Sequence, residues 1–160
     1  MCIRDRFKND YWIENLKYLP KKTREIWEDR IKFSNKNINP KQKDFSDWVQ
    51  RTTKEMYDYG IEFMAGTDTP LGFLIPGFSL HTELELLVES GMSELDAIKS
   101  ATINPSRYFK MENHLGLIKK GYIADLILLN TNPLENIKNT LDISLVIKDG
   151  KVYQDPLKTD

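Results

Sequence analysis

The chain has 160 residues and a formal net charge of -1. This length suits one domain with its own core, and a nearly neutral chain has no field that would attract nucleic acid or an anionic membrane. No apolar run approaches the roughly 20 residues of a spanning helix, and the single cysteine, Cys2, excludes an internal disulfide and a cysteine-rich metal site. We therefore expect neither a nucleic-acid partner nor a membrane partner.

The first six residues, MCIRDR, resemble a translated sequencing adapter. The N-terminal stretch lacks the apolar segment of a signal peptide and has neither helical nor strand periodicity. We expect residues 1–6 to be non-native and the true start to lie upstream. The localisation is therefore unknown: the cytoplasm is only the default, and a secreted or periplasmic location stays open.

Two helices are expected in the first part of the chain. Pro20 is placed to begin the first, which a loop over 34–44 follows. The second is amphipathic, and Gly60 sits where its C-cap belongs. Its apolar positions recur with helical spacing at Phe45, Trp48, Val49, Thr52 and Met56. We expect this second helix to pack on a sheet.

A strand is expected directly after that helix. Residues 61–65 (IEFMA) form a nearly continuous apolar run that ends at Gly66, as in strands covered on both faces. A loop with glycine and proline follows, and then a helix over 79–91 that Gly91 ends. The buried stripe of this helix is expected to comprise Leu80, Leu84, Leu87 and Val88.

Two shorter helices carry recognisable start signals. Ser93 and Asp96 form a capping box, with Met92 and Ala97 placed as its hydrophobic staple. In NPSRYF, Asn104 is expected to be the N-cap, because the following proline suits the first helical position.

The last part of the chain has the periodicity of strands. An apolar strand is expected over 124–129, and two alternating runs meet at Asp149 and Gly150, the strongest short signal for a hairpin. Asp125 is interpreted as structural, packing a turn against its strand. These features predict a small β layer appended to an α/β unit.

Asp68 is the candidate catalytic residue, in the stretch GTDTP after the expected strand. An aspartate in this position more often forms an Asx turn or caps a helix, because it bonds readily to its own backbone. In parallel α/β proteins, however, ligands bind at the C-terminal ends of strands. Both interpretations stay open on the residues alone.

Four stretches, in this order and spacing, resemble the C-terminal part of the amidohydrolase superfamily, especially its imidazolonepropionase-like and Xaa-Pro dipeptidase-like members. They read MAGTDT, SLHTELELLVESGMSELDAIKSATINPSRYF, GLIKKGYIADLILLNTNPLENI and VIKDGKVY. The resemblance implies an α/β fold in which residues 7–112 are the C-terminal part of a (β/α)8 TIM barrel, with its last strand and helices. Residues 113–160 would be the C-terminal half of a small composite β-sandwich.

The resemblance also implies a role for Asp68. In the family, the aspartate that ends the last barrel strand contacts a divalent metal, zinc in the first instance, and takes the proton from metal-bound water. A divalent cation lowers the pKa of bound water toward about 7, and a nearby carboxylate can serve first as base and then as acid. Asp68 matches that aspartate, both as catalytic residue and as metal ligand.

The chain lacks the other groups of such a site. It has two histidines, His81 and His114, and no His-x-His pair, whereas a catalytic zinc typically has three protein ligands. A complete barrel also takes about 250 residues. We therefore expect a C-terminal portion of a longer enzyme, with one or two metal ions in the complete protein and none held by this portion.

His81 is the second candidate site residue. It could bind substrate or orient Asp68, and the alternative is an ordinary polar residue in a first helical turn. Thr67 and Thr69 are expected to close the turn around Asp68, and His114 is expected to lie on the surface.

The residues after Asp68 do not identify a substrate. Glu83 and Glu85 are expected to face solvent. Four apolar side chains form either a wall near the site or plugs of the core: Phe73, Leu74, Ile75 and Phe78.

Two classes of function follow. The first is a metal-dependent hydrolase of carbon–nitrogen bonds in non-peptide amides or amidines, cyclic amides or dipeptides, whose partner is a small-molecule substrate. The second is a non-catalytic remnant or packing domain without the metal centre. A homo-oligomer stays open in either case.

Overall fold

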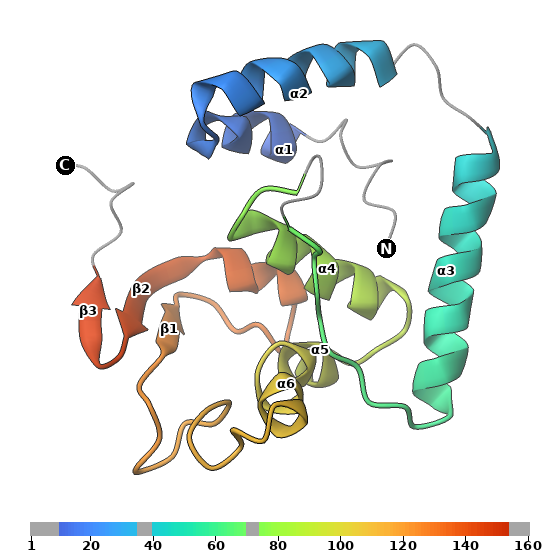
Figure 1. Ribbon diagram of the computed structural model, residues 1–160. Helices are drawn as coiled ribbons and strands as arrows, with labels where there is room; N and C mark the ends of the chain where they lie inside the picture. Colours follow the sequence, from blue (N-terminus) through green and yellow to red (C-terminus); the bar gives the residue numbers. More distant parts are fainter. Residues whose placement is uncertain (1–9, 35–39, 70–73, 154–160) are drawn as a thin grey trace.

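The computed structural model describes residues 10–34, 40–69 and 74–153 (Figure 1). Within these ranges the helices and strands follow one another as α1 (Asp10–Asn15), the 3-10 helix η2 (Leu16–Tyr18), α2 (Lys21–Ser34), α3 (Pro40–Asp58), α4 (Phe78–Glu89), α5 (Glu94–Ser100), α6 (Ile103–Tyr108), β1 (Leu126–Leu129), the 3-10 helix η3 (Ile137–Leu141), β2 (Ile143–Lys148) and β3 (Lys151–Tyr153). No helix in these ranges is both long and apolar enough to cross a membrane.

The first hydrophobic core lies between the N-terminal helices and α4. It comprises Leu16, Leu19, Trp27, Leu74, Ile75 and Leu86. Phe78 packs against it and stacks on Tyr18, with ring centroids 5.2 Å apart. Leu74 and Ile75 are therefore core residues, which decides between the two interpretations of this apolar stretch, while Phe73 lies outside the described residues.

The second core lies on the other side of α4, between this helix, α5 and η3. Its buried members are Leu84, Leu87, Met92, Ala97 and Ile137. Because α4 is covered on both sides, its buried surface is wider than the stripe expected from the sequence. Glu83 is buried, contrary to the expectation that it faces solvent, and burial raises the pKa of its carboxyl. Leu80, expected in the stripe, is exposed instead.

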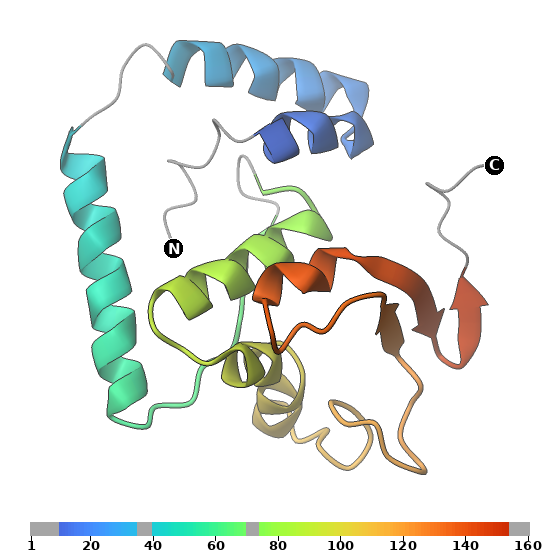
Figure 2. The same ribbon diagram turned by 180° about the vertical axis from the view of Figure 1, so that it is seen from behind.

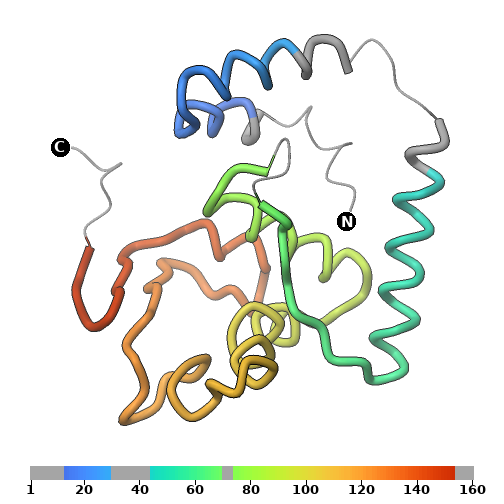
Figure 3. Tube along the Cα trace, in the orientation of Figure 1, coloured from blue at the N-terminus to red at the C-terminus, as the bar shows by residue number. Residues whose placement is uncertain are grey.

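Helix α3 does not pack on a sheet, contrary to expectation. Figure 3 shows it running along one side of the molecule, and its C-terminal end meets the body where the Tyr57 hydroxyl donates to Asp96 at 2.7 Å. Phe45 and Trp48, on its apolar stripe, are 51% and 53% exposed. The helical spacing correctly predicted the helix, but the sheet that the structure describes, β1 to β3, lies on the far side of the molecule from α3 (Figure 1).

The C-cap at Gly60 is confirmed. Gly60 has a φ of 80°, its N–H donates to Tyr57 O at 2.9 Å, and the Ile61 N–H donates to Met56 O at 3.1 Å. Such bonds satisfy the last carbonyls of a helix, and glycine adopts the left-handed conformation without steric cost. The chain therefore turns sharply from α3 into the next segment.

Residues 61–67 form an extended segment that is not paired as a strand with any described residue, so the expected strand 61–65 is not seen as one. Phe63 and Ala65 pack on the second core, whereas Met64 points outward and is exposed. Two hydrogen bonds hold the segment: Ala65 N–H to Ser100 O at 2.9 Å, and Asn104 Nδ2 to Phe63 O at 3.0 Å.

The use of Asn104 in this bond corrects the expected start of α6. Its helix begins at Ile103, and Thr102 stands at the N-cap without a side-chain capping bond. The Asn104 amide instead reaches across to the extended segment. The Asn104 side chain therefore bonds to a segment distant in sequence and does not form the local capping bond that the following proline predicted.

The N-cap at the start of α5 is confirmed, but the return bond of a capping box is not formed, because Ser93 N–H lies 3.5 Å from the Tyr57 hydroxyl oxygen and not against the Asp96 carboxylate. The Ser93 hydroxyl oxygen accepts from Asp96 N–H at 3.1 Å, and Met92 and Ala97 are both buried in the second core. The Asp96 carboxylate also accepts from Lys99 at 2.8 Å. Hydrogen bonds from Lys99, Tyr57 and Ser93 lower the pKa of Asp96 to about 2.

Because the pKa of Asp96 is lower in the folded chain than its ordinary value of 3.8, its ionised form stabilises the fold above that pH. We expect this contribution to disappear as the pH falls from 3.8 toward about 2. Thermal unfolding should therefore show a steeper loss of Tm with acid in this window for the wild type than for Asp96→Asn. Equal slopes for the two proteins would contradict the assigned hydrogen bonds.

The C-terminal part forms an antiparallel sheet in the order β1, β2, β3. The expected hairpin is confirmed: Asp149 and Gly150 join β2 to β3 with φ values of 50° and 71°, as a tight two-residue turn requires. Asp125 has the structural role expected of it, because its carboxylate accepts from Asp149 N–H at 2.8 Å and from Lys148 Nζ. Strand β1 begins at Leu126, slightly later than expected.

Candidate active site

Asp68 lies at the end of the extended segment, with its side chain exposed. Its φ of 58° is in the left-handed region, which aspartate tolerates better than most residues. The turn around it is closed by others: the hydroxyl oxygens of Thr67 and Thr69 are 2.8 Å apart, and Thr69 N–H donates to Thr67 Oγ1 at 3.4 Å. This is the role expected of the two threonines.

The Asp68 carboxylate has no hydrogen bond or ion pair with any other residue that the structure describes. An Asx turn or a helix cap would occupy one of its oxygens with a backbone N–H. The carboxylate is therefore presented to solvent.

His81 occupies the first turn of α4 and is half-buried. Its Nδ1 lies 3.0 Å from Thr140 Oγ1, on η3. Burial lowers the pKa of the imidazole, so the ring is neutral at neutral pH. Within the described ranges no hydrogen bond joins His81 to Asp68, and a role in substrate binding stays a prediction. His114 is exposed, as expected.

The described residues do not by themselves fit a divalent metal. Asp68 offers one carboxylate, and no three or more His, Cys, Asp or Glu side chains within 10–34, 40–69 and 74–153 stand close enough together to hold an ion. A catalytic zinc typically has three protein ligands. Any such centre would need ligands from outside these residues.

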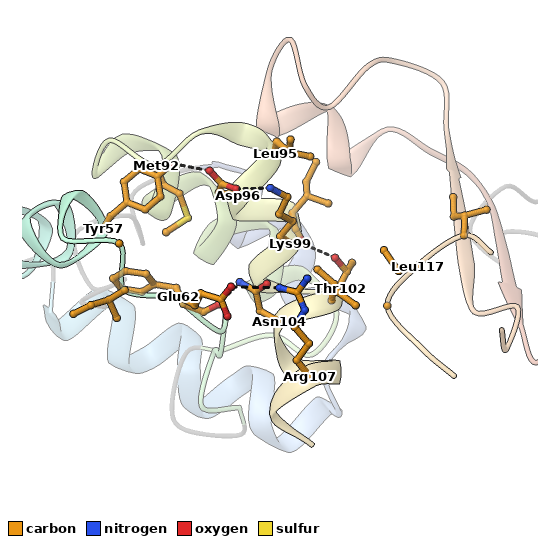
Figure 4. Close-up of a pocket in the computed structure, with 17 residues that line it drawn as sticks. Tyr57, Glu62, Met92, Leu95, Asp96, Lys99, Thr102, Asn104, Arg107 and Leu117 are labelled. Atoms are coloured by element: carbon orange, nitrogen blue, oxygen red, sulfur yellow. Dashed lines mark hydrogen bonds and ion pairs between the residues drawn. The ribbon is translucent and has the colours of Figure 1, made fainter. Parts of the chain in front are cut away.

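A cavity of about 650 Å³ lies elsewhere, between the end of α3, the start of the extended segment, α5, α6 and residues 116–118 (Figure 4). Its charged groups are paired with one another: Arg107 with Glu62 at 3.3 Å, and Lys99 with Asp96 at 2.8 Å. Neither candidate site residue lines it. An extended chain rises about 3.3 Å per residue, so Asp68 lies roughly 15 Å beyond the part of the segment that borders this cavity.

No motif in the sequence pointed to this cavity, because its lining comes from five separate segments. With its charges already paired, the cavity offers no convergent set of free polar groups that would make it the better catalytic candidate. Asp68 therefore remains the centre of the candidate site.

Comparison with known proteins gives consistent relatives. The chain is 38% identical over 102 residues to the ochratoxinase of Aspergillus niger, covering 61% of this chain and 20% of that protein. It is 37% identical over 65 residues to an adenine deaminase of Thermosipho africanus, covering 41% of this chain and 10% of that protein. The chain thus spans about a fifth or less of the length of these curated relatives.

Among solved structures, a Xaa-Pro dipeptidase with methionine bound in its active site superposes with a TM-score of 0.61 and 34% identity. The match covers 67% of this chain and 26% of the dipeptidase. The model of the Amidohydrolase family matches residues 13–153, which is most of the chain. The chain therefore belongs to the Amidohydrolase family.

Proposed function

We propose that this chain is the C-terminal part of a metal-dependent hydrolase of carbon–nitrogen bonds, in which Asp68 is the acid–base carboxylate. The names of the relatives support this reaction class, since they include an ochratoxinase, an adenine deaminase and a Xaa-Pro dipeptidase. The observation that carries the proposal is the exposed Asp68 carboxylate, which has no hydrogen bond or ion pair with any described residue.

Asp68 would act on both halves of the reaction. It would accept a proton from the attacking water as the new carbon–oxygen bond forms. It would then give that proton to the leaving nitrogen as the carbon–nitrogen bond breaks. A positioned carboxylate of this kind typically accelerates a reaction by about 10²–10⁴-fold.

A divalent metal, zinc in the first instance, is proposed for the complete protein. Such an ion would polarise the bond under attack. Asp68 would be one of its ligands, and the remaining ligands would come from outside the described residues, because these contain no group of three or more His, Cys, Asp or Glu able to hold an ion.

The exposed apolar surface supports the proposed barrel. Met64 projects outward from a segment whose backbone is not paired as a strand with described residues. The apolar stripe of α3 is exposed as well. In a (β/α)8 barrel, a last strand has neighbours on both edges and a helix covers its outer face. We propose this arrangement for residues 7–112, with residues 113–160 as half of a β-sandwich.

A non-catalytic packing domain is the second candidate function. The observation that favours it is the stripe of α3, where Phe45, Trp48 and Met56 are exposed together. Exposed apolar patches of this kind mark contact surfaces. In that case the surface would bind a partner and Asp68 would have no chemical role.

The test is turnover by the complete gene product that contains this chain, against a panel of an ochratoxin, Xaa-Pro dipeptides and adenine, with and without zinc. Hydrolysis that a chelator abolishes and Asp68→Asn reduces supports the hydrolase. Metal-dependent hydrolysis by the 160-residue chain alone, folded and monomeric, would mean that this chain supplies every metal ligand and would contradict the proposal that it is only part of the hydrolase.

A further inference from the structure

Thr140 connects η3 to the first turn of α4. Figure 2 shows η3 lying alongside α4, and the Thr140 side chain is buried between them. Its Oγ1 lies 2.8 Å from Ile137 O and 3.0 Å from His81 Nδ1. Both distances are those of hydrogen bonds.

The proton count at this hydroxyl settles the direction of both bonds. A threonine hydroxyl has one proton, and a carbonyl oxygen can only accept. Thr140 therefore donates to Ile137 O, and its oxygen accepts from His81 Nδ1–H. If Thr140 donated to His81 Nδ1 instead, the oxygens of Thr140 and Ile137 would face each other at 2.8 Å without a proton between them. This is unfavourable in a buried site, where no water can replace the missing hydrogen bond.

The other ring nitrogen of His81 is then an acceptor. A neutral imidazole with its proton on Nδ1 has a lone pair on Nε2, and burial keeps the ring neutral by lowering its pKa. Nε2 has no hydrogen bond to any other described residue. Nε2 is also accessible to solvent. Among the described side-chain atoms, the one that is enclosed and lacks a hydrogen-bond partner is Glu112 Oε2, not His81 Nε2.

We infer that Thr140 is a positioning residue that fixes His81 as the Nδ1–H tautomer, so that His81 Nε2 accepts a hydrogen bond from an N–H group of the substrate. The first half of this inference stands on the contacts alone. The second half rests on the proposed function, because the substrates of a carbon–nitrogen hydrolase carry such N–H groups.

The tautomer is tested by nitrogen NMR of the whole protein labelled with ¹⁵N-histidine, with the His81 signals assigned by their loss in His81→Asn. We expect an unprotonated Nε2 and a protonated Nδ1 at neutral pH. Thr140→Val should give a mixture of tautomers, and Thr140→Ser should restore the wild-type pattern. A protonated Nε2 in the wild type, or a pattern that Thr140→Val leaves unchanged, would overturn the inference.

Substrate binding is tested with two variants of His81 that separate its nitrogens. Asparagine places its amide near the position of Nδ1 and keeps a donor for Thr140, whereas glutamine reaches the position of Nε2. We expect His81→Asn to raise KM about 10-fold with kcat little changed, because a bond of equal strength in ground and transition states is lost. His81→Gln should recover part of the loss.

An unchanged KM in His81→Asn would overturn the second half of the inference. These outcomes are separable from the fate of the proposed function, which depends on Asp68. If Asp68→Asn retains activity while the NMR pattern is as expected, the proposed function fails and the tautomer assignment stands. If Asp68→Asn is inactive and Nε2 is protonated, the reverse holds.

Discussion

Asp68→Asn in the complete protein should lower kcat by about 10²–10⁴-fold while leaving the fold intact. The asparagine amide has the same shape as the carboxylate but cannot accept a proton from water and return it to a leaving nitrogen. The fold should be unaffected because the carboxylate bonds to no other described residue. Steady-state kinetics and thermal unfolding, measured on the same preparation, check both parts.

A matched control for this variant is Asp47→Asn, on α3. Asp47 is also exposed and has no hydrogen bond or ion pair within the described part of the chain, so its substitution should leave kcat and Tm unchanged. Full activity in Asp68→Asn would refute the acid–base role. Equal losses in the two variants would point to a general effect of charge.

Gly116→Ala should destabilise the chain by about 2–5 kcal/mol. Gly116 has a φ of 89°, and a Cβ added there would lie 2.8 Å from Ile103 Cα and 2.9 Å from Thr102 O. The left-handed backbone alone costs an alanine roughly 1–2 kcal/mol, and forced overlap in a packed region typically adds about 1–3 kcal/mol. Because both neighbours are backbone atoms, neither can move aside as a flexible side chain would.

The matched control is Gly121→Ala. Gly121 has a φ of 90°, and nothing lies within 4 Å of an added Cβ. This variant should show the backbone cost without the overlap, about 1–2 kcal/mol. Urea denaturation of both proteins measures the difference, and equal losses would mean that the loop at Gly116 moves away from α6 freely.

Features set by a few consecutive residues could be predicted from the sequence. The N-cap at Ser93, the C-cap at Gly60 and the hairpin at Asp149 each depend on local backbone bonds, and all three are confirmed. Features that depend on neighbours far along the chain could not. The burial of Glu83 requires α4 to be covered on both sides, and Asn104 finds a partner on a segment about forty residues earlier.

The candidate site likewise has a local part that could be predicted from the sequence and a long-range part that could not. The position of Asp68 after an apolar run could be seen in the sequence, and the closing of its turn by two threonines was the expected arrangement. The contact between His81 and Thr140 could not be predicted, because 59 positions separate them and no motif links them. Periodicity detects which residues share a face but does not reveal what lies opposite that face.

The two hydrogen bonds that hold the extended segment have a consequence for the tolerance of this region to insertions and deletions. Because Phe63 and Ala65 are bound to α6 and α5, adding one residue between Ala65 and Asp68 would move the left-handed turn at Asp68 relative to these anchors and change the direction of its carboxylate. Helices that supply no chemistry thus set the direction of the proposed acid–base group. Working members of the family should therefore keep the spacing between these anchors and the aspartate constant, even where the residues themselves vary.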